Sequence, residues 1–349
     1  MSDEGHVLTE DILRRAERKI AKEYAKAEQE VSDKYQDYLR RFEIKDRIKR
    51  DQVERGVITR EEYNKWRIGQ IAVGKRWEAM RDALAQDYFN ADRIAHSIAE
   101  SYMPEVYALN YNYQTYHIEH TGQIDTSFTL YRRETVEWLI KNDDLQLLPP
   151  PSPWGETARR LTEHPDLIWN KQKLQSAILQ GILQGESIPA MAKRVEEVGE
   201  MDHRAAIRNA RTMATTAQNT GRYDAIYRAK SVGVDQVLEW QATLDARTRT
   251  SHRMMHGQRR EVGQPFEVDG VKIMYAGDPY APQKEIWNCR CTILSWVRGY
   301  EGKTVTSSPK MGDMTFEEWQ KAKPVSNPID LPERKAERIR WKYIQGYKR

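Results

Sequence analysis

The sequence predicts a mainly α-helical protein with a small α+β carboxy-terminal domain: long amphipathic helices come first, and helices packed on a small antiparallel sheet follow. Apolar residues recur at spacings of three and four in most segments before Gly233, as on one face of a helix. After Gly233, short segments rich in β-branched and aromatic residues alternate with turn residues, as in strands. The charged content of 31% agrees with helices that bury one stripe and expose the rest.

Two long helices are expected first. One runs from Leu8 to Arg41 on the spacing of its apolar residues. The next begins at Thr59, which a glutamate follows three residues later as in a capping box, and its apolar stripe continues to Ile98. With Gly56 between them, the two helices would pack as an antiparallel hairpin. A third helical segment is expected to open at Pro104, because proline suits a first turn.

The proline-rich stretch Leu147-Leu-Pro-Pro-Pro-Ser-Pro predicts a stiff connector and the main domain boundary. Residues 1–146 are therefore expected to form a helical amino-terminal domain and residues 147–160 a linker. Residues 161–300 would form the α+β domain, and residues 301–349 a mobile linker and basic tail, with a short helix from Thr315 to Lys323.

The α+β domain is expected to begin with helices at residues 166–184, after Ser187, and from His203 to Lys230 with Asp202 as N-cap. Short segments rich in β-branched or aromatic residues then predict three strands, at Gln236–Trp240, Gln258–Val262 and Ile286–Trp296. A hairpin with an Asp-Gly turn is predicted around Val268–Val271.

Composition narrows the function classes. The chain has no apolar run near 18 residues and starts with polar, acidic residues, so we expect no membrane segment and no signal peptide. The net charge of +4 over 349 residues is small, so nucleic-acid contacts would have to come from local patches. Two cysteines in a chain of this length suit a reducing compartment, and we expect synthesis and assembly in the cytoplasm.

The two cysteines, Cys289 and Cys291, are one residue apart in a segment expected to be a strand, which would point both sulfurs to one face. A disulfide between them would be strained. His252 and His256 are four apart in a short helical run, which would place both imidazoles on one face. Two thiolates and two imidazoles form a tetrahedral ligand set, for which zinc is the expected cofactor. The alternative is two buried thiols that pack as small apolar groups without a metal.

Several short motifs resemble the carboxy-terminal domain of the phage head morphogenesis or minor head protein family, of the phage Mu F-like and SPP1 minor head protein-like type. They cover residues 170 to 300 and comprise Ala210-Arg-Thr, Asn219-Thr-Gly-Arg, Trp240-Gln-Ala-Thr-Leu-Asp, Thr248-Arg249, His252, Gly257 and Asn288-Cys-Arg-Cys. The resemblance implies a low-copy minor capsid protein inside the virion head, near the portal, that head morphogenesis and infectious particles require. Its implied partners are the portal protein, the major capsid or scaffolding protein and further copies of itself.

The resemblance implies a structural motif, which consists of Asp245, Thr248, Arg249, Gly257 and Asn288. Asp245 is expected to accept backbone N–H bonds at a turn or helix start, and Arg249 to be available for a carboxylate. No residue is predicted to be catalytic.

The final residues interleave basic and aromatic side chains, a pattern that suits an arm lying on DNA or on an acidic protein surface. The alternative is that the aromatic residues pack this tail back on its own domain. The predicted contacts to packaged double-stranded DNA are Arg334, Lys335, Arg338, Arg340 and Lys342.

Three function classes remain: a structural head-assembly protein, a metal- or Cys/His-dependent enzyme of nuclease type acting during packaging or ejection, and a DNA-binding protein. The enzyme would use Cys289 or Cys291 as a nucleophile beside His252, or a bound metal. The sequence favours the structural class, because it lacks the paired carboxylates of known metal nucleases and a glycine loop for phosphate.

Overall fold

The computed structural model describes residues 4–71, 75–142, 145, 147, 165–184, 186, 188–299 and 314–327. Two predicted features lie outside the described residues. They are the linker beyond Leu147 and the basic tail residues Arg334, Lys335, Arg338, Arg340 and Lys342. Contacts divide the chain into two compact units. Unit 1 comprises Met1–Ala16, Ala99–Pro150 and Arg208–Arg349, and unit 2 comprises Glu17–Ile98 and Pro151–Ile207.

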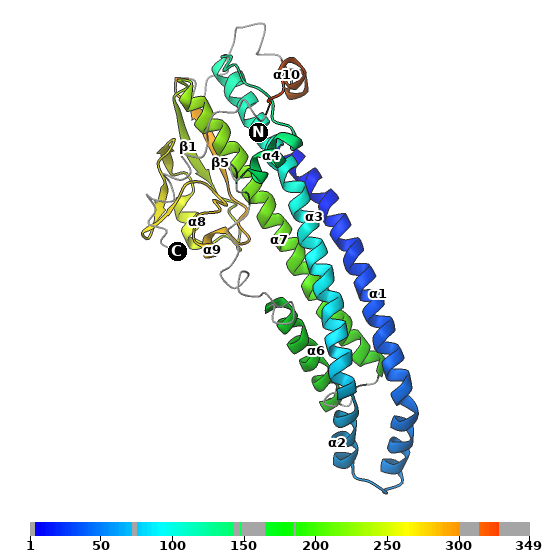
Figure 1. The fold of residues 1–349 in the computed structure, drawn as a ribbon. Helices are drawn as coiled ribbons and strands as arrows, with labels where there is room; N and C mark the ends of the chain where they lie inside the picture. Colours follow the sequence, from blue (N-terminus) through cyan, green and yellow to red (C-terminus); the bar gives the residue numbers. More distant parts are fainter. Residues whose placement is uncertain are drawn as a thin grey trace. The chain divides into compact units, whose positions relative to one another are not determined.

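The predicted division into consecutive domains, 1–146 and 161–300, differs from these units. Three long helices each supply residues to both: α1 (Glu4–Glu54), α3 (Lys75–Gly122) and α7 (Ile188–Ser231) (Figure 1). Because each of these helices continues across the boundary between the two units, the spacing of apolar residues does not break there.

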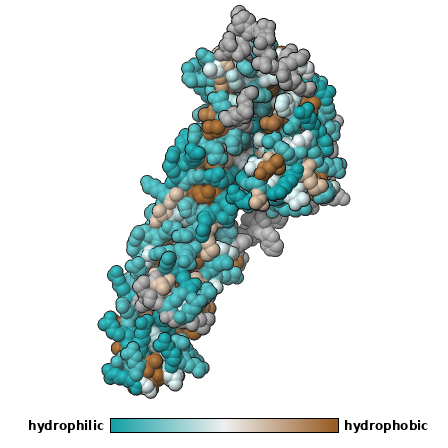
Figure 2. Space-filling view, turned by 180° about the vertical axis from the view of Figure 1, so that it is seen from behind, coloured by the Kyte–Doolittle hydropathy of each residue, from teal (hydrophilic) through white to brown (hydrophobic). Residues whose placement is uncertain are grey.

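The surface matches the charged composition. Figure 2 shows one face on which most residues are hydrophilic and hydrophobic residues form small separate groups. Within the described residues, no helix combines the length and apolar character that crossing a bilayer requires.

Unit 2 is helical, as predicted. It contains parts of α1, α3 and α7 together with α2 (Arg60–Ile71) and α6 (Pro165–Leu183). The turn into α2 has the expected form: Gly56 takes a φ of 72°, and the backbone N–H of Thr59 donates to the Glu62 carboxylate over 2.8 Å. The Glu62 N–H in turn donates to the Thr59 hydroxyl over 3.1 Å, which completes the capping box.

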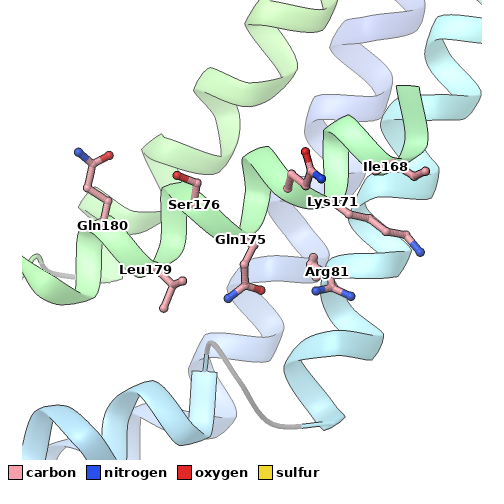
Figure 3. A pocket seen from close by; sticks show the side chains of 8 residues that line it. Arg81, Ile168, Lys171, Gln175, Ser176, Leu179 and Gln180 are labelled. Atoms are coloured by element: carbon pink, nitrogen blue, oxygen red, sulfur yellow. The ribbon is translucent and has the colours of Figure 1, made fainter. Parts of the chain in front are cut away.

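An open hollow of about 630 Å³ lies in unit 2 between α3 and α6 (Figure 3). Arg81 lines it from α3, and Ile168, Lys171, Gln175 and Leu179 are among the residues that line it from α6. Arg81 and Lys171 both pair with the same carboxylate, that of Asp82, at 2.8 and 3.2 Å. The hollow contains none of the predicted site residues.

Two predicted helix starts are wrong. Pro104 lies inside α3, and Asp202 lies inside α7 rather than at its N-cap. A proline within a helix removes one backbone hydrogen bond, but Met103, Val106 and Tyr107 around it are buried, so packing outweighs that loss. Asp202 favours a cap position by its side chain, but helix α7 begins at Ile188 and continues through it to Ser231.

Unit 1 joins helices to a small sheet. The sheet is antiparallel with strand order β2-β1-β5, and a separate hairpin pairs β3 with β4. The strands are β1 (Gln236–Gln241), β2 (Arg259–Glu261), β3 (Phe266–Val268), β4 (Val271–Ile273) and β5 (Thr292–Val297). The shorter helices are α4 (Arg133–Lys141), α8 (Thr250–Met255), α9 (Gln283–Ile286) and α10 (Phe316–Ala322).

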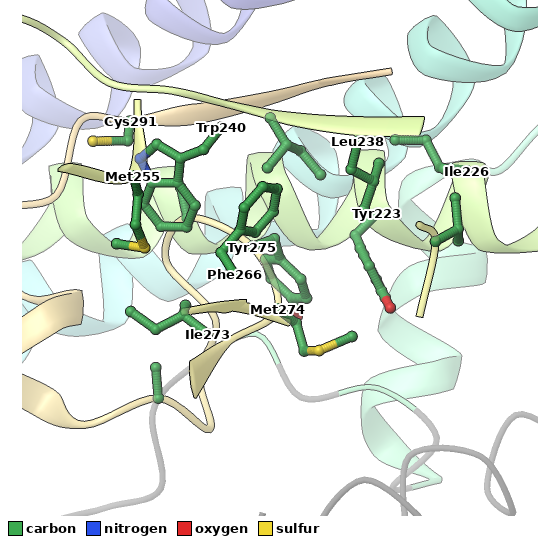
Figure 4. Packing of buried hydrophobic residues seen from close by; sticks show 14 of the residues in the cluster. Tyr223, Ile226, Leu238, Trp240, Met255, Phe266, Ile273, Met274, Tyr275 and Cys291 are labelled. Carbon is green, nitrogen blue, oxygen red and sulfur yellow. The ribbon is translucent and has the colours of Figure 1, made fainter. Parts of the chain in front are cut away.

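One apolar core fills the space between α7, the sheet and the β3–β4 hairpin. Residues of β1 alternate between buried and half-buried, so that Leu238 and Trp240 point into this core. Figure 4 shows them packed with Phe266, Tyr275 and Ile226. The predicted Asp-Gly turn is confirmed between β3 and β4, where both central residues have positive φ.

The last strand is shorter than predicted. Residues Gln283–Ile286 form helix α9, and β5 begins only at Thr292. Cys289 and Cys291 therefore precede the strand instead of belonging to it. Asn288 takes a left-handed φ of 57°, which turns the chain between α9 and this segment.

Candidate functional site

Three of the four predicted ligands converge in unit 1. Nδ1 of His252, on α8, lies 3.6 Å from the sulfur of Cys289 and 3.4 Å from that of Cys291, in the segment before β5. All three ligand atoms lie within 4.8 Å of one another. The side chains are buried, with exposed fractions of 1%, 3% and 4%. Both sulfurs thus reach one imidazole although the cysteines are not in a strand.

His256 does not join this group, which corrects the predicted four-residue set. Helix α8 ends at Met255, and His256 has a φ of −54° and a ψ of 128°, outside helical geometry. The four-residue spacing therefore no longer places its ring beside that of His252. Nδ1 of His256 instead accepts a hydrogen bond of 3.2 Å from the backbone N–H of Ala242. Gly257, with a φ of 75°, ends the turn and donates to the carbonyl of Trp240.

The second nitrogen of His252 faces a carboxylate. Nε2 lies 3.2 Å from Oε2 of Glu285, within ion-pair distance but without the alignment of a formed hydrogen bond. The same oxygen accepts a hydrogen bond of 2.9 Å from the Ser251 hydroxyl. The ring of Trp240 packs edge-on against the imidazole, with centroids 5.3 Å apart. The histidine is thereby fixed in position on two sides.

Helix α7 holds the backbone on both sides of the cysteines. The Thr215 hydroxyl donates to the carbonyl of Cys289, and the Asn219 amide donates to that of Cys291, each over 3.0 Å. The Thr212 hydroxyl accepts from the N–H of Asn288 over 3.0 Å. Three side chains on one helix therefore satisfy three backbone groups of the Asn-Cys-Arg-Cys segment.

Arg290, between the two cysteines, is bound by Asp245. Its guanidinium donates to both carboxylate oxygens, over 2.6 and 2.7 Å. The hydrogen bonds from Arg290 hold the pKa of Asp245 well below its ordinary value, and the N–H of Arg247 acts in the same direction. Asp245 thus accepts a backbone N–H at a turn, as predicted.

Arg249 has a different partner from the one predicted. Its guanidinium donates to the backbone carbonyl of Trp287, whereas Arg290 binds the carboxylate. Thr248 closes the turn, because its hydroxyl donates to Asp245 over 3.2 Å. The Thr243 hydroxyl donates to the carbonyl of Arg290 over 2.7 Å, so this loop also holds the cysteine segment.

The two thiols differ in acidity. The Cys291 sulfur and burial raise the pKa of Cys289, whereas the hydrogen bond from Cys289, followed by that of His252, lowers the pKa of Cys291. The pair therefore loses its first proton more readily than two isolated buried thiols would. A thiolate beside an imidazole can bind a soft metal ion or act as a nucleophile, but a nucleophile must also meet its substrate, and both sulfurs are buried.

Sequence reasoning gave no contact with the cysteine segment to Thr212, Thr215, Asn219 or Thr243. It also missed Glu285 and the pairing of Arg290 with Asp245. Asn219 and Arg290 stand within the motifs that carried the resemblance, but their roles had no signal in the sequence. Thr215 and Glu285 lie outside those motifs, and only the packing of α7 and α9 brings them to the cysteines.

Comparisons with known proteins agree with the motifs. A family model described as phage Mu protein F like protein matches residues 172–294. Minor head protein GP7 of Bacillus phage SPP1 is 27% identical over 232 residues, which are 64% of this chain and 68% of that protein. NAD(+)--arginine ADP-ribosyltransferase EFV of Enterococcus faecalis is 28% identical over 187 residues, which are 52% of this chain but 37% of that protein. No solved structure matches the chain.

The segment matched by the family model runs from α6 into β5. It contains the three converging ligands, the Asp245–Arg290 pair and the α7 residues that hold the cysteine segment. Residues 172–294, which contain this site, are therefore similar to the family of phage Mu protein F-like proteins.

Proposed function

We propose that this protein is a minor head protein of a tailed bacteriophage, lies inside the head beside the portal, and is needed for head morphogenesis and infectious particles. The observation that carries the proposal is the family match across the hydrogen-bonded core of unit 1. It is supported by the relative named as a minor head protein, 68% of whose length the chain covers.

The chemistry of the motif cluster supports a structural role. Backbone carbonyls of the cysteine segment accept hydrogen bonds from Thr243, Thr215 and Asn219. Asp245 binds the Arg290 side chain, so these residues hold the segment rather than lining an open site. Such contacts fix the cysteine segment to the loop around Asp245 and to helix α7. They break no bond and need no substrate.

The relative named as an ADP-ribosyltransferase favours an alternative, in which the chain is an enzyme that acts during packaging or ejection. Only 37% of that protein is covered, so its activity is not carried over to this chain without a test. Two assays of the purified protein distinguish the enzyme from the structural protein. One supplies NAD and arginine-containing acceptors, and the other supplies double-stranded DNA and divalent metal ions. Modified acceptor or cleaved DNA that is lost in His252→Asn would favour the enzyme.

We propose that exposed apolar side chains on unit 2 dock on the portal protein. Ile44, Ile48 and Val57 on and after α1 are 72%, 55% and 66% exposed. The first two are four residues apart on a helix and are neighbours on its surface. A second set, Leu244 and Met254 on unit 1, is 63% and 54% exposed, and we assign it to the major capsid or scaffolding protein.

The basic tail after Glu333 would contact packaged double-stranded DNA. Its basic residues alternate with aromatic ones, which combines phosphate attraction with base stacking. Because phosphate contacts release counterions, DNA retention by this tail should weaken as salt rises.

The test uses particles assembled with altered protein and mass spectrometry of separated empty and full heads. Replacing Ile44, Ile48 and Val57 by serine should strongly reduce incorporation, and replacing Leu244 and Met254 by serine tests the proposed unit 1 surface in the same way. Ending the chain at residue 332 should leave incorporation intact and weaken salt-sensitive DNA retention. Normal copy number in the first variant would remove the unit 2 docking surface. Absence of the unaltered protein from both kinds of head would remove the proposed function itself.

A further inference from the structure

The three converging ligand atoms have the spacing of a tetrahedral metal site. Zinc binds thiolate sulfur at about 2.3 Å and imidazole nitrogen at about 2.0 Å, which at tetrahedral angles separates nitrogen from sulfur by about 3.5 Å. The measured separations from Nδ1 of His252 are 3.6 Å to Cys289 and 3.4 Å to Cys291. Within the described residues, these three side chains are also the one group of histidine, cysteine and carboxylate residues that approaches closely enough to hold an ion.

The surroundings of His252 assign its proton. Glu285 lies 3.2 Å from Nε2, and a carboxylate beside that nitrogen favours the tautomer in which Nε2 carries the hydrogen. Nδ1 then presents its lone pair to the two sulfurs. A carboxylate that orients a ligating histidine from its far side is the usual outer partner in zinc proteins.

Both sulfurs are buried beside Nδ1 of His252, with exposed fractions of 3% and 4%. A metal ion binds the thiolate form of cysteine and not the thiol. Two thiolates in a buried place need positive charge close by, and a divalent ion supplies it where the interior excludes water.

The geometry points to a transition-metal site of the zinc type, in which Nδ1 of His252 and the sulfurs of Cys289 and Cys291 are ligands and Glu285 orients the histidine. Soft thiolates with an imidazole select zinc over magnesium or calcium. Both thiols release their protons to solvent as the ion binds. The ion would join α8 to the segment before β5, and His256 is not a ligand.

Metal analysis of the full-length protein, produced with zinc in the growth medium, tests this assignment. We expect about one zinc ion per chain, which is the load of a single site. His252→Asn and Cys291→Ser should lose it, while His256→Gln, the matched histidine control, should retain it. Wild-type protein with no more zinc than the Cys289→Ser/Cys291→Ser double variant would overturn the proposal. Equal loss in His256→Gln and His252→Asn would overturn the three-residue ligand set.

A cobalt titration keeps the test valid if the ligand variants do not fold. Metal-stripped wild-type protein should bind cobalt with the sulfur-to-metal charge-transfer absorption that thiolate ligands give. Glu285→Ala should weaken zinc affinity by about 10- to 100-fold in competition with a chelator, as loss of an outer partner does, whereas the exposed Glu267→Ala should not. Cobalt bound without charge-transfer absorption would refute thiolate ligation. These readouts need no phage particles, so they succeed or fail independently of the proposed head function.

Discussion

At the scale of single residues, the side chains around the cysteine segment mainly bind backbone groups, and Asp245 is the main charged exception. It pairs with Arg290 through two hydrogen bonds. Asp245→Asn keeps the shape of the side chain but loses the charge, so its thermal midpoint at pH 7 should lie below that of wild type. Asp235→Asn is the control, because Asp235 is 63% exposed and lies 3.5 Å from its arginine, where a surface pair contributes little.

The pH dependence of this difference has a definite sign. The folded pKa of Asp245 is lowered, so its ionised form stabilises the fold at pH values above the unfolded pKa. The difference between wild type and Asp245→Asn should therefore begin to shrink below about pH 4, where unfolded carboxyl groups take up protons. Thermal melts from pH 7 to pH 2 measure it. A difference that stays constant over that range would contradict the assigned ion pair.

Asn219 offers a second test at this scale. Its amide donates to the carbonyl of Cys291 and its oxygen accepts from the hydroxyl of Thr292. Asn219 is 1% exposed, so Asn219→Ala leaves a buried carbonyl without this donor and should cost about 1–3 kcal/mol in denaturant unfolding. Asn209→Ala, at an exposed position of the same helix, should stay within about 0.5 kcal/mol of wild type. Equal effects of the two changes would show that the Asn219 hydrogen bonds contribute nothing specific.

The residues of the site were only partly predictable. His252, Cys289 and Cys291 stand out because their side chains are metal ligands, and their positions in the sequence predict that they converge. His256 had the same chemistry and a helical spacing, but helix α8 ends one residue too early for that spacing to apply. Glu285 could not be found, because its role depends on the α9 turn that replaced part of the predicted strand.

At the scale of elements, the crossing of α3 and α7 depends on a glycine. A Cβ at Gly221 would lie 2.6 Å from the carbonyl oxygen of Tyr107, a backbone atom that cannot swing away. Gly221→Ala should therefore destabilise the protein by about 3 kcal/mol, the upper end for overpacking. Gly69→Ala in the exposed part of α2 has no atom within 4 Å and should instead stabilise by about 0.5–1 kcal/mol. If both changes stabilise, the close approach of the two helices is wrong.

The buried carboxyl of Asp202 inside α7 predicts an unusual pH response. Burial, with Asp92 nearby, raises its pKa to about 7. The unfolded carboxyl loses its proton near pH 4, so between about pH 4 and 7 the folded state binds more protons and its stability falls as pH rises. Asp202→Asn should remove this decline and stabilise the protein by about 2–4 kcal/mol at pH 8.

The exposed Asp33→Asn in the same unit serves as the control for that measurement and should leave the pH profile unchanged. Chemical denaturation at several pH values between 4 and 8 provides the data. A difference in stability between wild type and Asp202→Asn that stays constant over this window would show that Asp202 is ionised in the folded protein.

Helices and strands were predictable where apolar residues recur at a regular spacing over a long, uninterrupted segment. The turn into α2, the Asp-Gly turn and strand β1 follow from apolar spacing and turn residues. The single helix predicted from Thr59 to Ile98 is wrong, because α2 ends at Ile71 and α3 begins at Lys75. Pro104 and Asp202 were misread as helix starts, because local preference is the only signal available before the tertiary packing is known. The start of β5 was misplaced for the same reason, since α9 and the cysteine segment contain residues that also suit a strand.

At the scale of the whole molecule, unit 1 draws on both ends of the described chain. Asn110 donates to the hydroxyl of Thr9 over 2.8 Å, and Arg211 lies 3.8 Å from Glu10. Removing residues 1–16 should therefore weaken the unit that contains the sheet, although these residues are far from it in sequence. Hydrogen exchange of β1 and β5 in the shortened protein should be faster than in wild type. Unchanged protection of both strands would show that the start of α1 is dispensable to unit 1.

The interleaving of the two units also constrains synthesis. Residues 1–16 leave the ribosome about two hundred positions before their partner Arg211 on α7. Until then, the apolar stripe at the start of α1 has no complete surface to cover it, so newly made chains pass through a stage that exposes it to other chains. Contacts between such distant segments slow folding and favour aggregation. A ribosome that stalls before α7 is complete would therefore release a product that needs a chaperone, and the yield of assembled protein should depend on the rate of translation through residues 208–231.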